Sequence, residues 1–363
     1  MKNFNLPSDY KPFSDKYFLR AKEVLERDNL NPIVKAQIFI RSGNCKVYGI
    51  DEAIAILAKY ANTSKLKIFA LQEGTEIAPC ETVMTVEGPI QEIIALETMY
   101  LGTIAGETSI QNDKRDIDFN EVEKNMRSIV DLVGDRTISY FGARHWRWDA
   151  DALIAKACFR GGAKFCSTDI GAEAIGQKGV GTIPHALECI YHWKYGIKRA
   201  VVEATKAFDK YIDKAVPRIA LIDYANREIS DSLRTIEEVP NLYGIRVDTC
   251  GENVMQGSIL MEDDEPYMFS RGVSILGVYM LNSVIRKEGD YKIILSSGFG
   301  NPEKVQAFID AEEVIGERLF DSLGVGGVYE SRIATMDIIE VDSQEIHKVG
   351  RPVKPNSRLE RVI

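Results

Sequence analysis

Short runs of β-forming residues alternate with helix-like segments through most of this chain, from about residue 119 to residue 327. Such alternation is typical of parallel sheets, in which a helix connects each strand to the next across one face. We count six or seven strand–helix units, a number that favours an α/β barrel, complete or incomplete, over an open sheet. The strand-like stretches are 137–141, 163–166, 179–183, 218–223, 242–248, 293–297 and 319–327.

The first hundred residues have a different pattern. Residues 14–29 form an amphipathic helical pattern that Ser14 or Asp15 can cap, and 33–40 alternate as in a strand. Asp51 is expected to cap a second helix, and Gly106 to follow the last residue of a long apolar one. Helices and strands mixed in this way predict an α+β unit.

Three parts of the chain follow from these patterns. We predict an α+β domain over residues 1–115 and an α/β barrel over residues 116–330. The remaining segment, 331–363, contains strand-like runs that we expect to return to the first domain.

Composition excludes several classes of function. The chain has 363 residues with 45% hydrophobic and 27% charged residues, and no apolar run approaches the roughly 18–20 residues that span a bilayer. A net charge of −9 argues against bulk attraction to nucleic acid. Six cysteines without a CxxC pair, and a start without a secretory signal, predict reduced thiols in a cytoplasmic protein.

Two glycine-rich loops follow the last two strand-like stretches. SSGFGN covers residues 296–301 and LGVGG covers 323–327. Glycines let backbone N–H groups approach a phosphate closely, and a following helix adds the positive end of its dipole. In barrel enzymes the last two strands commonly build a phosphate site, so we predict one here.

Acidic residues end two other stretches. Asp223 closes RIALID, and Asp248 closes YGIRVD with Arg246 two residues earlier on the same face. An aspartate at the carboxyl end of a buried strand can bind ribose hydroxyls or a magnesium ion. Helix capping is the alternative for either residue alone, but two on neighbouring units favour function.

The stretch FGARHWRW, with the later GTIPHAL, carries the remaining candidates. Arg144 follows Phe141 across a glycine, and an aromatic face beside a guanidinium suits a flat aromatic acid. His145 is the next residue. His185 opens a helix, where an imidazole is expected to stay neutral and fit for hydrogen bonding or nucleophilic attack.

Several short segments, in order, resemble the nicotinate phosphoribosyltransferases, especially the shorter archaeal-type ones. They cover about 310 residues of the chain. The matching segments are SDKYFLR (14–20), EGTEIAP (73–79), ALETMYLGTIAG (95–106), FGARH (141–145), VGTIPHAL (180–187), VPRIALID (216–223), RVDT (246–249), SSG (296–298) and LGVGG (323–327).

The resemblance implies a type II phosphoribosyltransferase fold and a homodimer whose subunits share each active site. The implied reaction joins nicotinate to phosphoribosyl pyrophosphate, giving nicotinate mononucleotide and pyrophosphate for NAD biosynthesis. Many members couple this reaction to ATP hydrolysis through a phosphohistidine and use Mg²⁺.

The resemblance also implies roles for residues of this chain. Phe141 and Tyr17 match the aromatic sandwich around the pyridine ring, with Tyr17 from the neighbouring subunit. Arg144 would meet the nicotinate carboxylate and the donor, and His185 would be phosphorylated. The ribose, pyrophosphate or metal would be held by Asp223, Arg246 and Asp248, with both aspartates as metal ligands. The 5′-phosphate would lie among Ser296, Gly298, Gly324, Gly326 and Gly327.

The chain departs from its relatives at several positions. Ser297 replaces a glycine of the phosphate loop, and Lys164 stands where relatives have an acid. Tyr224 replaces a threonine or serine. The segment 250–269 does not match and is acidic at 262–265.

Other functions stay open on the sequence alone. Lys164, Arg147 and Arg160 could bind the second carboxylate of quinolinate, which makes a quinolinate phosphoribosyltransferase an alternative, and a nicotinamide enzyme is another. Lys164 or Lys178 could form a Schiff base in a lyase barrel. The altered glycine loop also allows a ligand-binding relative without catalysis.

Overall fold

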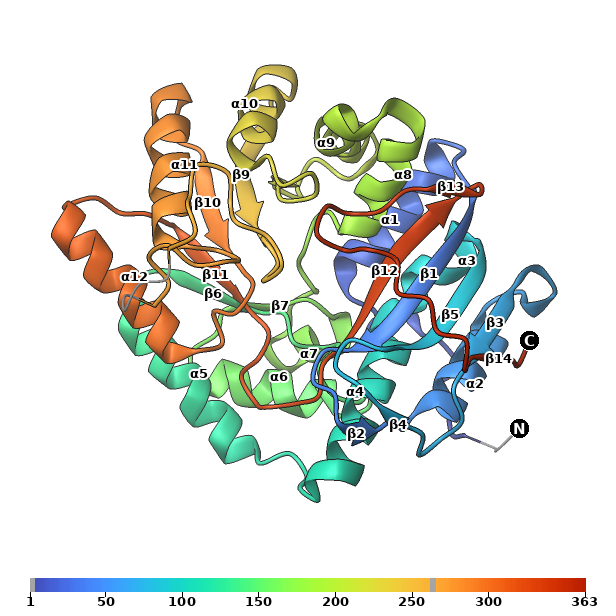
Figure 1. Ribbon diagram of the computed structural model, residues 1–363. Coiled ribbons are helices and arrows are strands. Elements are labelled where there is room, and N and C mark those ends of the chain that lie inside the picture. Colours follow the sequence, from blue (N-terminus) through green and yellow to red (C-terminus); the bar gives the residue numbers. More distant parts are fainter. Residues whose placement is uncertain (1–3, 262–265) are drawn as a thin grey trace.

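A computed structural model describes residues 4–261 and 266–363 and contains two six-stranded sheets that face one another (Figure 1). One sheet is antiparallel and is built from the two ends of the chain. The other is parallel, curled and covered on its outer face by helices. The acidic stretch 262–265 lies outside the described residues.

The parallel sheet is the incomplete barrel that the sequence predicts. All of its ladders are parallel, as expected when helices connect successive strands. Its strands, in spatial order, are β7 (Phe165–Cys166), β6 (Thr137–Tyr140), β11 (Ser322–Val325), β10 (Lys292–Leu295), β9 (Leu242–Val247) and β8 (Arg218–Leu221).

The stretch 179–183, which the sequence grouped with the strands, is not a strand. The Val180 N–H donates to the Cys166 carbonyl at 2.8 Å, and the Thr182 hydroxyl donates to the Ile219 carbonyl at 2.8 Å. The stretch therefore crosses the gap between β7 and β8. One backbone hydrogen bond does not make a ladder, so the barrel stays open at this point.

Helices of the barrel cover the outer face of the parallel sheet (Figure 1). They are α5 (Phe119–Val133), α6 (Asp151–Arg160), α7 (Asp169–Ala172), α8 (His185–Tyr195), α9 (Ala200–Tyr211), α10 (Glu228–Glu238), α11 (Ile275–Glu288) and α12 (Pro302–Ile315).

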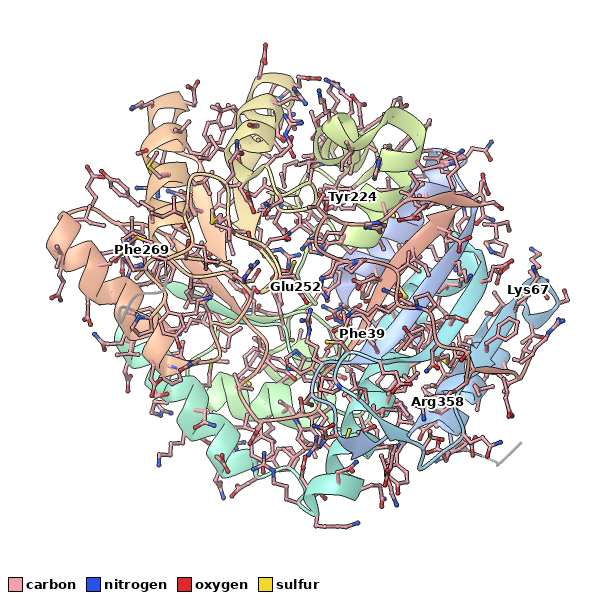
Figure 2. The ribbon with its side chains drawn as sticks, viewed as in Figure 1. Phe39, Lys67, Tyr224, Glu252, Phe269 and Arg358 are labelled. Atoms are coloured by element: carbon pink, nitrogen blue, oxygen red, sulfur yellow. The ribbon has the colours of Figure 1, made fainter. Side chains whose placement is uncertain are left out.

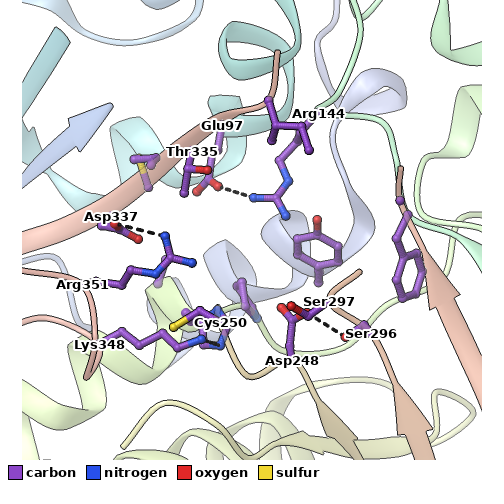
Figure 3. Close-up of a pocket in the computed structure, with 18 of the residues that line it drawn as sticks. Glu97, Arg144, Asp248, Cys250, Ser296, Ser297, Thr335, Asp337, Lys348 and Arg351 are labelled. Carbon is purple, nitrogen blue, oxygen red and sulfur yellow. Dashed lines mark hydrogen bonds and ion pairs between the residues drawn. The ribbon is translucent and has the colours of Figure 1, made fainter. Parts of the chain in front are cut away.

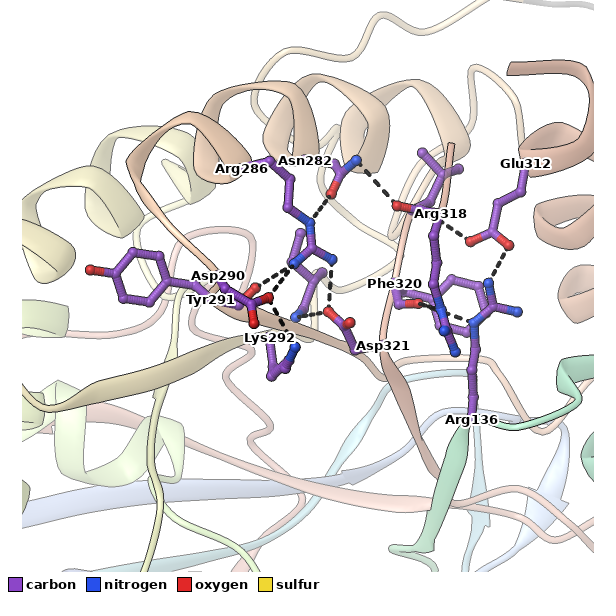
Figure 4. Close-up of polar contacts among 12 residues, drawn as sticks. Arg136, Asn282, Arg286, Asp290, Tyr291, Lys292, Glu312, Arg318, Phe320 and Asp321 are labelled. Carbon is purple, nitrogen blue, oxygen red and sulfur yellow. Dashed lines mark hydrogen bonds and ion pairs between the residues drawn. The ribbon is translucent and has the colours of Figure 1, made fainter. Parts of the chain in front are cut away.

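Polar contacts fix the amino-terminal ends of β10 and β11 beneath the outer helices (Figure 4). Arg286 on α11 donates to Asp321 at 2.8 Å, and the same carboxylate oxygen accepts the Ile293 N–H at 2.8 Å. Arg136, just before β6, pairs with Glu312 on α12. These contacts lie at the opposite end of the strands from the candidate residues, so their role is stability of the barrel.

The antiparallel sheet joins residues from both ends of the chain. β12, drawn in red in Figure 1, pairs with β1 along its whole length, and β14 pairs with β3. The domain limits at residues 115 and 330 stay predictions. The strands, in spatial order, are β13 (Gln344–Glu345), β12 (Ala334–Val341), β1 (Ile33–Ile40), β5 (Thr82–Pro89), β3 (Lys67–Ala70) and β14 (Glu360–Arg361), with a separate pair, β2 (Cys45–Lys46) and β4 (Glu76–Ile77).

The helices of this half are α1 (Lys16–Arg27), α2 (Ile50–Tyr60), α3 (Ile90–Ile93) and α4 (Glu97–Asp113). One predicted cap is wrong, and another has the predicted position without a cap hydrogen bond. The N-cap of α2 is Gly49, and the Glu73 carboxylate accepts the N–H groups of Gly49 and Asp51, so Asp51 lies inside the first turn. Asp15 is the N-cap residue of α1, as predicted, but its carboxylate accepts from the Thr98 hydroxyl at 2.9 Å and makes no cap bond.

Gly106 does not end the apolar helix, as the sequence suggested, but lies inside α4. A side chain built on Gly106 would place its Cβ 2.7 Å from the backbone nitrogen of Arg147, and one on Gly102 would lie 2.4 Å from the Trp146 carbonyl oxygen. The two glycines therefore allow the loop after β6 to cross the helix in close contact. This crossing positions the loop that carries Arg144.

Candidate active site

A cavity of about 400 Å³ lies where the carboxyl ends of the parallel strands face the antiparallel sheet. Its size is typical of small-molecule sites. Four residues that the sequence placed in separate loops, Arg144, His185, Asp248 and Gly326, all line it. The other predicted site residues that line it are Tyr17, Phe141, His145, Arg246, Ser296, Gly298, Gly324 and Gly327.

The aromatic pair belongs to a single chain. The ring centroids of Tyr17, on α1, and Phe141, directly after β6, lie 6.5 Å apart with planes at 77°. Tyr17 thus lies beside Phe141 of its own chain, and its expected contribution to the site of a neighbouring subunit stays a prediction. The guanidinium of Arg246 lies 6.0 Å from the Tyr17 ring and 5.9 Å from the Phe141 ring. A flat ligand would thus meet two aromatic rings and one cation.

Arg144 lies on the cavity side of the loop that crosses α4. Its Nη1 donates to Glu97 at 2.9 Å, and its Nε lies 3.7 Å from the Asp15 carboxylate (Figure 3). Burial raises the pKa of Glu97 to about 8, although Arg144 opposes this shift. Within the described part of the chain, Nη2 of Arg144 makes no hydrogen bond, so it is available to a ligand carboxylate.

His185 is held from behind by Asp223 and Lys348. Its Nε2 lies 3.0 Å from Asp223 Oδ1 and 3.0 Å from Lys348 Nζ, and Lys348 also donates to the second Asp223 oxygen. Burial lowers the pKa of His185. Burial opposes ionisation of Asp223, but His185 and Lys348 hold its pKa well below the usual value. The structure therefore favours a neutral imidazole beside a buried ion pair.

Asp223 and Asp248 differ as metal ligands. Asp223 is fully buried, and both of its oxygens are bound by His185 and Lys348. Asp248 lines the cavity, and one of its oxygens accepts from the Ser296 hydroxyl at 2.8 Å. Magnesium sites often use one or two carboxylates together with substrate phosphates. The donor set thus fits a magnesium ion at Asp248 and does not fit one at Asp223.

The two glycine loops lie side by side at the ends of β10 and β11. Gly298, Gly326 and Gly327 line the cavity, as does Gly324. Gly324 also has a structural role, because a Cβ there would lie 2.8 Å from the ring of Phe141. The loops are therefore placed where the sequence predicts a phosphate site, and one of the glycines makes room for an aromatic ring.

Sequence reasoning missed a group of cations that comes from the other half of the molecule. Arg41 follows β1, while Lys348 and Arg351 lie on the C-terminal segment after β13. In Figure 3 the side chains of Lys348 and Arg351 extend into the cavity from the same side. Nε and Nη1 of Arg351 are buried without a hydrogen-bond partner in the described residues. The only sequence signal was the strand-like tail, which does not identify these side chains.

The side of the cavity that carries Arg41, Lys348 and Arg351 forms a cationic wall, and part of the unmatched segment 250–269 contributes to it. Cys250 lines the cavity, and Glu252 accepts a hydrogen bond from Arg41 at 3.2 Å. Figure 2 shows Glu252 between the half-barrel and the antiparallel sheet. Arg351 lies 3.7 Å from Glu252 and 3.8 Å from Asp337. The segment in which this chain differs from its relatives therefore contributes to the lining of the cavity.

The predicted substrate role of Lys164 does not agree with its position. Lys164 and Lys178 are exposed, and neither lines the cavity. Arg147 pairs with Glu52, Glu107 and Asp149, while Arg160 pairs with Glu123. Arg147 and Arg160 are thus already paired with carboxylates, and none of the three residues suggested for quinolinate lines the cavity. Schiff-base chemistry at Lys164 or Lys178 loses its basis for the same reason.

His145 gives a prediction on stability. Burial lowers its pKa from 6.5 to about 4, and Arg144 and Arg41 act in the same direction. The His145 imidazole is therefore protonated below about pH 6.5 in the unfolded chain, but only below about pH 4 in the folded chain. We expect stability to fall through this window as the pH is lowered. The free energy of unfolding, measured by urea titration, should depend less on pH in His145→Gln. The difference in slope should be up to about 1.4 kcal/mol per pH unit. Equal slopes in both proteins would contradict the assignment.

Comparison with known proteins places the fold in a known class. Residues 15–107 match the family "Quinolinate phosphoribosyl transferase, N-terminal domain". A Saccharomyces cerevisiae structure assigned as a nicotinate phosphoribosyltransferase is 14% identical, with a TM-score of 0.70, and the match covers 96% of this chain and 94% of that one. The nicotinate phosphoribosyltransferase of Porphyromonas gingivalis is 14% identical, with a TM-score of 0.65 over 93% and 92% of the two chains.

The chain therefore has the type II phosphoribosyltransferase fold, and the resemblance seen in the sequence is confirmed at that level. A nicotinate-nucleotide pyrophosphorylase from Pyrococcus furiosus is 26% identical, covering 100% of this chain and 86% of that one, with a TM-score of 0.45. Among the described residues, no helix has the length and apolar character needed to cross a membrane.

Proposed function

We propose that this protein is a nicotinate phosphoribosyltransferase. It would join nicotinate to phosphoribosyl pyrophosphate and release nicotinate mononucleotide and pyrophosphate, for NAD biosynthesis. The observation that carries the proposal is one cavity, on this fold, that combines an aromatic pair, an arginine with a free N–H edge and two glycine loops.

The chemistry needs placement more than proton transfer. The pyridine nitrogen of nicotinate has a free lone pair, so no general base is required. As pyrophosphate leaves, ribose C1 gains oxocarbenium character, which favours a site that holds both reactants and offsets charge. Arg144 would bind the carboxylate, and Tyr17 and Phe141 would hold the ring. Asp248 would face the ribose and pyrophosphate.

A magnesium ion would be held by Asp248 together with oxygens of the donor pyrophosphate. When bound, the ion would offset negative charge on the leaving group. Asp223 would serve instead to orient His185, because its oxygens are already bound.

ATP coupling through His185 is the second part of the proposal. The cavity brings a neutral imidazole next to Lys348, with Arg41 and Arg351 on the same wall. Cations there would attract the phosphates of ATP and place the terminal one near the ring. In the tautomer with the proton on Nε2, that N–H would donate to Asp223, Lys348 would donate to the other Asp223 oxygen, and the Nδ1 lone pair would be free to accept the phosphoryl group.

The assembly and location of the protein are also proposals. We propose a cytoplasmic homodimer. Tyr17 lies beside Phe141 within one chain, and the contribution of a partner subunit to a shared site is part of this proposal.

Turnover of nicotinate with phosphoribosyl pyrophosphate and Mg²⁺, with and without ATP, tests the proposal. We expect nicotinate mononucleotide as the product, formed faster or at lower substrate concentration with ATP. Activity on nicotinamide alone would overturn the substrate assignment. Tight binding of the donor without turnover of any base would identify a non-catalytic relative.

Quinolinate is the second candidate substrate, for a specific reason. The cavity contains cations beyond Arg144 and Arg246, and a second carboxylate could pair with the wall of Arg41, Lys348 and Arg351. All three of these cations already face carboxylates, namely Glu252, Asp223 and Asp337, which favours the acid with one carboxylate. Release of CO₂ from quinolinate at a rate above nicotinate turnover would reverse the order.

A further inference from the structure

The loop between β10 and α12 has an unusual backbone at Ser297. Its φ is +67°, and the following Gly298 has φ of +86°. Residues with a side chain seldom adopt this left-handed conformation, and a serine there persists only when surrounding contacts hold it. Both residues line the cavity. The contact that holds Ser297 is therefore part of the site.

That contact comes from Lys304 in the first turn of α12. Its Nζ donates to the Ser297 carbonyl oxygen at 3.0 Å, and its side chain is only 7% exposed. The rings of Phe299 and Tyr267 flank the ammonium group at 4.6 Å and 5.9 Å. Lys304 does not line the cavity, so it supports the loop from behind.

The charge of Lys304 is not balanced by protein groups. No carboxylate forms an ion pair with it among residues 4–261 and 266–363, although Asp248 acts on it from a distance. A cation in the first turn of a helix also faces the positive end of the helix dipole. Burial lowers the pKa of Lys304 to about 8. A buried cation without a paired carboxylate gains stability when an anion binds close by.

The peptide plane determines where the next N–H points. In a trans peptide, the carbonyl of Ser297 and the N–H of Gly298 point in opposite directions. The carbonyl points back to Lys304, so the Gly298 N–H points away from α12, toward the cavity side of the loop. Within the described residues this N–H has no hydrogen-bond partner, and Gly298 is exposed.

We propose that Lys304 is the positioning residue of a phosphate-monoester site. It holds the Ser297 carbonyl behind the loop, directs the Gly298 N–H to the phosphate, and adds a positive charge to the site. The proposed function identifies the ligand as the 5′-phosphate of the ribosyl donor, and the inference rests on it to that extent. Lys304 thereby offsets the loss of the glycine that relatives have in place of Ser297.

The test compares Lys304→Met and Lys304→Arg. We expect Lys304→Met to raise the KM for phosphoribosyl pyrophosphate, and the Kd for ribose 5-phosphate in calorimetry, by about tenfold or more, while kcat changes far less. Lys304→Arg keeps the charge and a donor, so it should restore much of the binding. Lys292→Met is the matched control, because Lys292 lies at the other end of β10 and pairs with Asp290.

The outcomes separate this inference from the proposed function. A packing role for Lys304 predicts the opposite order, in which methionine is tolerated and arginine is harmful, and that order would overturn the inference. Equal binding of ribose 5-phosphate by wild type and Lys304→Met would also overturn it while leaving the proposed function in place. Wild-type protein that binds neither the donor nor ribose 5-phosphate would refute both. Circular dichroism and melting curves confirm that each variant is folded.

Discussion

Arg144→Ala should reduce kcat/KM for nicotinate by on the order of a hundredfold to a thousandfold, with the fold intact. The substitution removes the guanidinium that faces the cavity and leaves Glu97 buried without its partner. Because burial raises the pKa of Glu97 to about 8, the carboxyl group can take up a proton at neutral pH and avoid an isolated buried charge. Steady-state kinetics and melting temperature measure the two effects separately.

Arg147→Ala is the matched control for this prediction. Arg147 lies three residues further on the same loop and also pairs with carboxylates, but it does not line the cavity. The Arg147→Ala variant should be less stable than the wild type and should keep its activity at temperatures where it is folded. Activity near the wild-type level in folded Arg144→Ala would refute a role in binding the carboxylate or the donor.

His185→Ala should remove the stimulation by ATP and leave some basal transfer. The imidazole is the nucleophile proposed to carry the phosphoryl group, and neither Asp223 nor Lys348 can replace it in that role, because both are bound to each other. Phosphate transferred from γ-labelled ATP to the protein, stable to alkali and labile to acid, should appear in the wild type and be absent in the variant.

His192→Ala provides the comparison on the same helix. Its ring lies 2.9 Å from the Tyr224 hydroxyl and does not line the cavity. ATP stimulation and labelling should therefore persist in this variant. Unchanged ATP coupling in His185→Ala would remove His185 from the proposed role, whatever the fate of basal transfer.

The half-barrel could be predicted because its signals are local. Strands of the barrel are short apolar runs separated by helices, and parallel strands must place their carboxyl ends at one edge of the sheet. Phe141, Asp248, Ser296 and Gly326 each follow a strand directly, so their common cavity follows from the order of elements alone. The exception, 179–183, has the composition of a strand and lies between β7 and β8, but it forms no ladder of backbone hydrogen bonds with either.

The roles of glycines and acids were harder to assign from sequence. Gly106 was expected to end a helix, yet it lies inside α4 because another segment, far along the chain, crosses there. Asp223 and Asp248 end similar runs, but one is buried in an ion pair and the other faces the cavity. Residue type and spacing do not distinguish these cases, since burial depends on contacts between distant segments.

The sequence by itself determined the fold class and the cavity residues that follow the strands of the half-barrel, because both depend on short-range periodicity and on the shared edge of parallel strands. Only the tertiary structure decided which cations complete the site. Arg41, Lys348 and Arg351 reach the cavity because β1 and the C-terminal segment pack beside the strand ends, more than a hundred residues away from His185 in the case of Lys348. Contacts between residues so far apart in the sequence arise from packing of the two sheets, and no local sequence pattern predicts them.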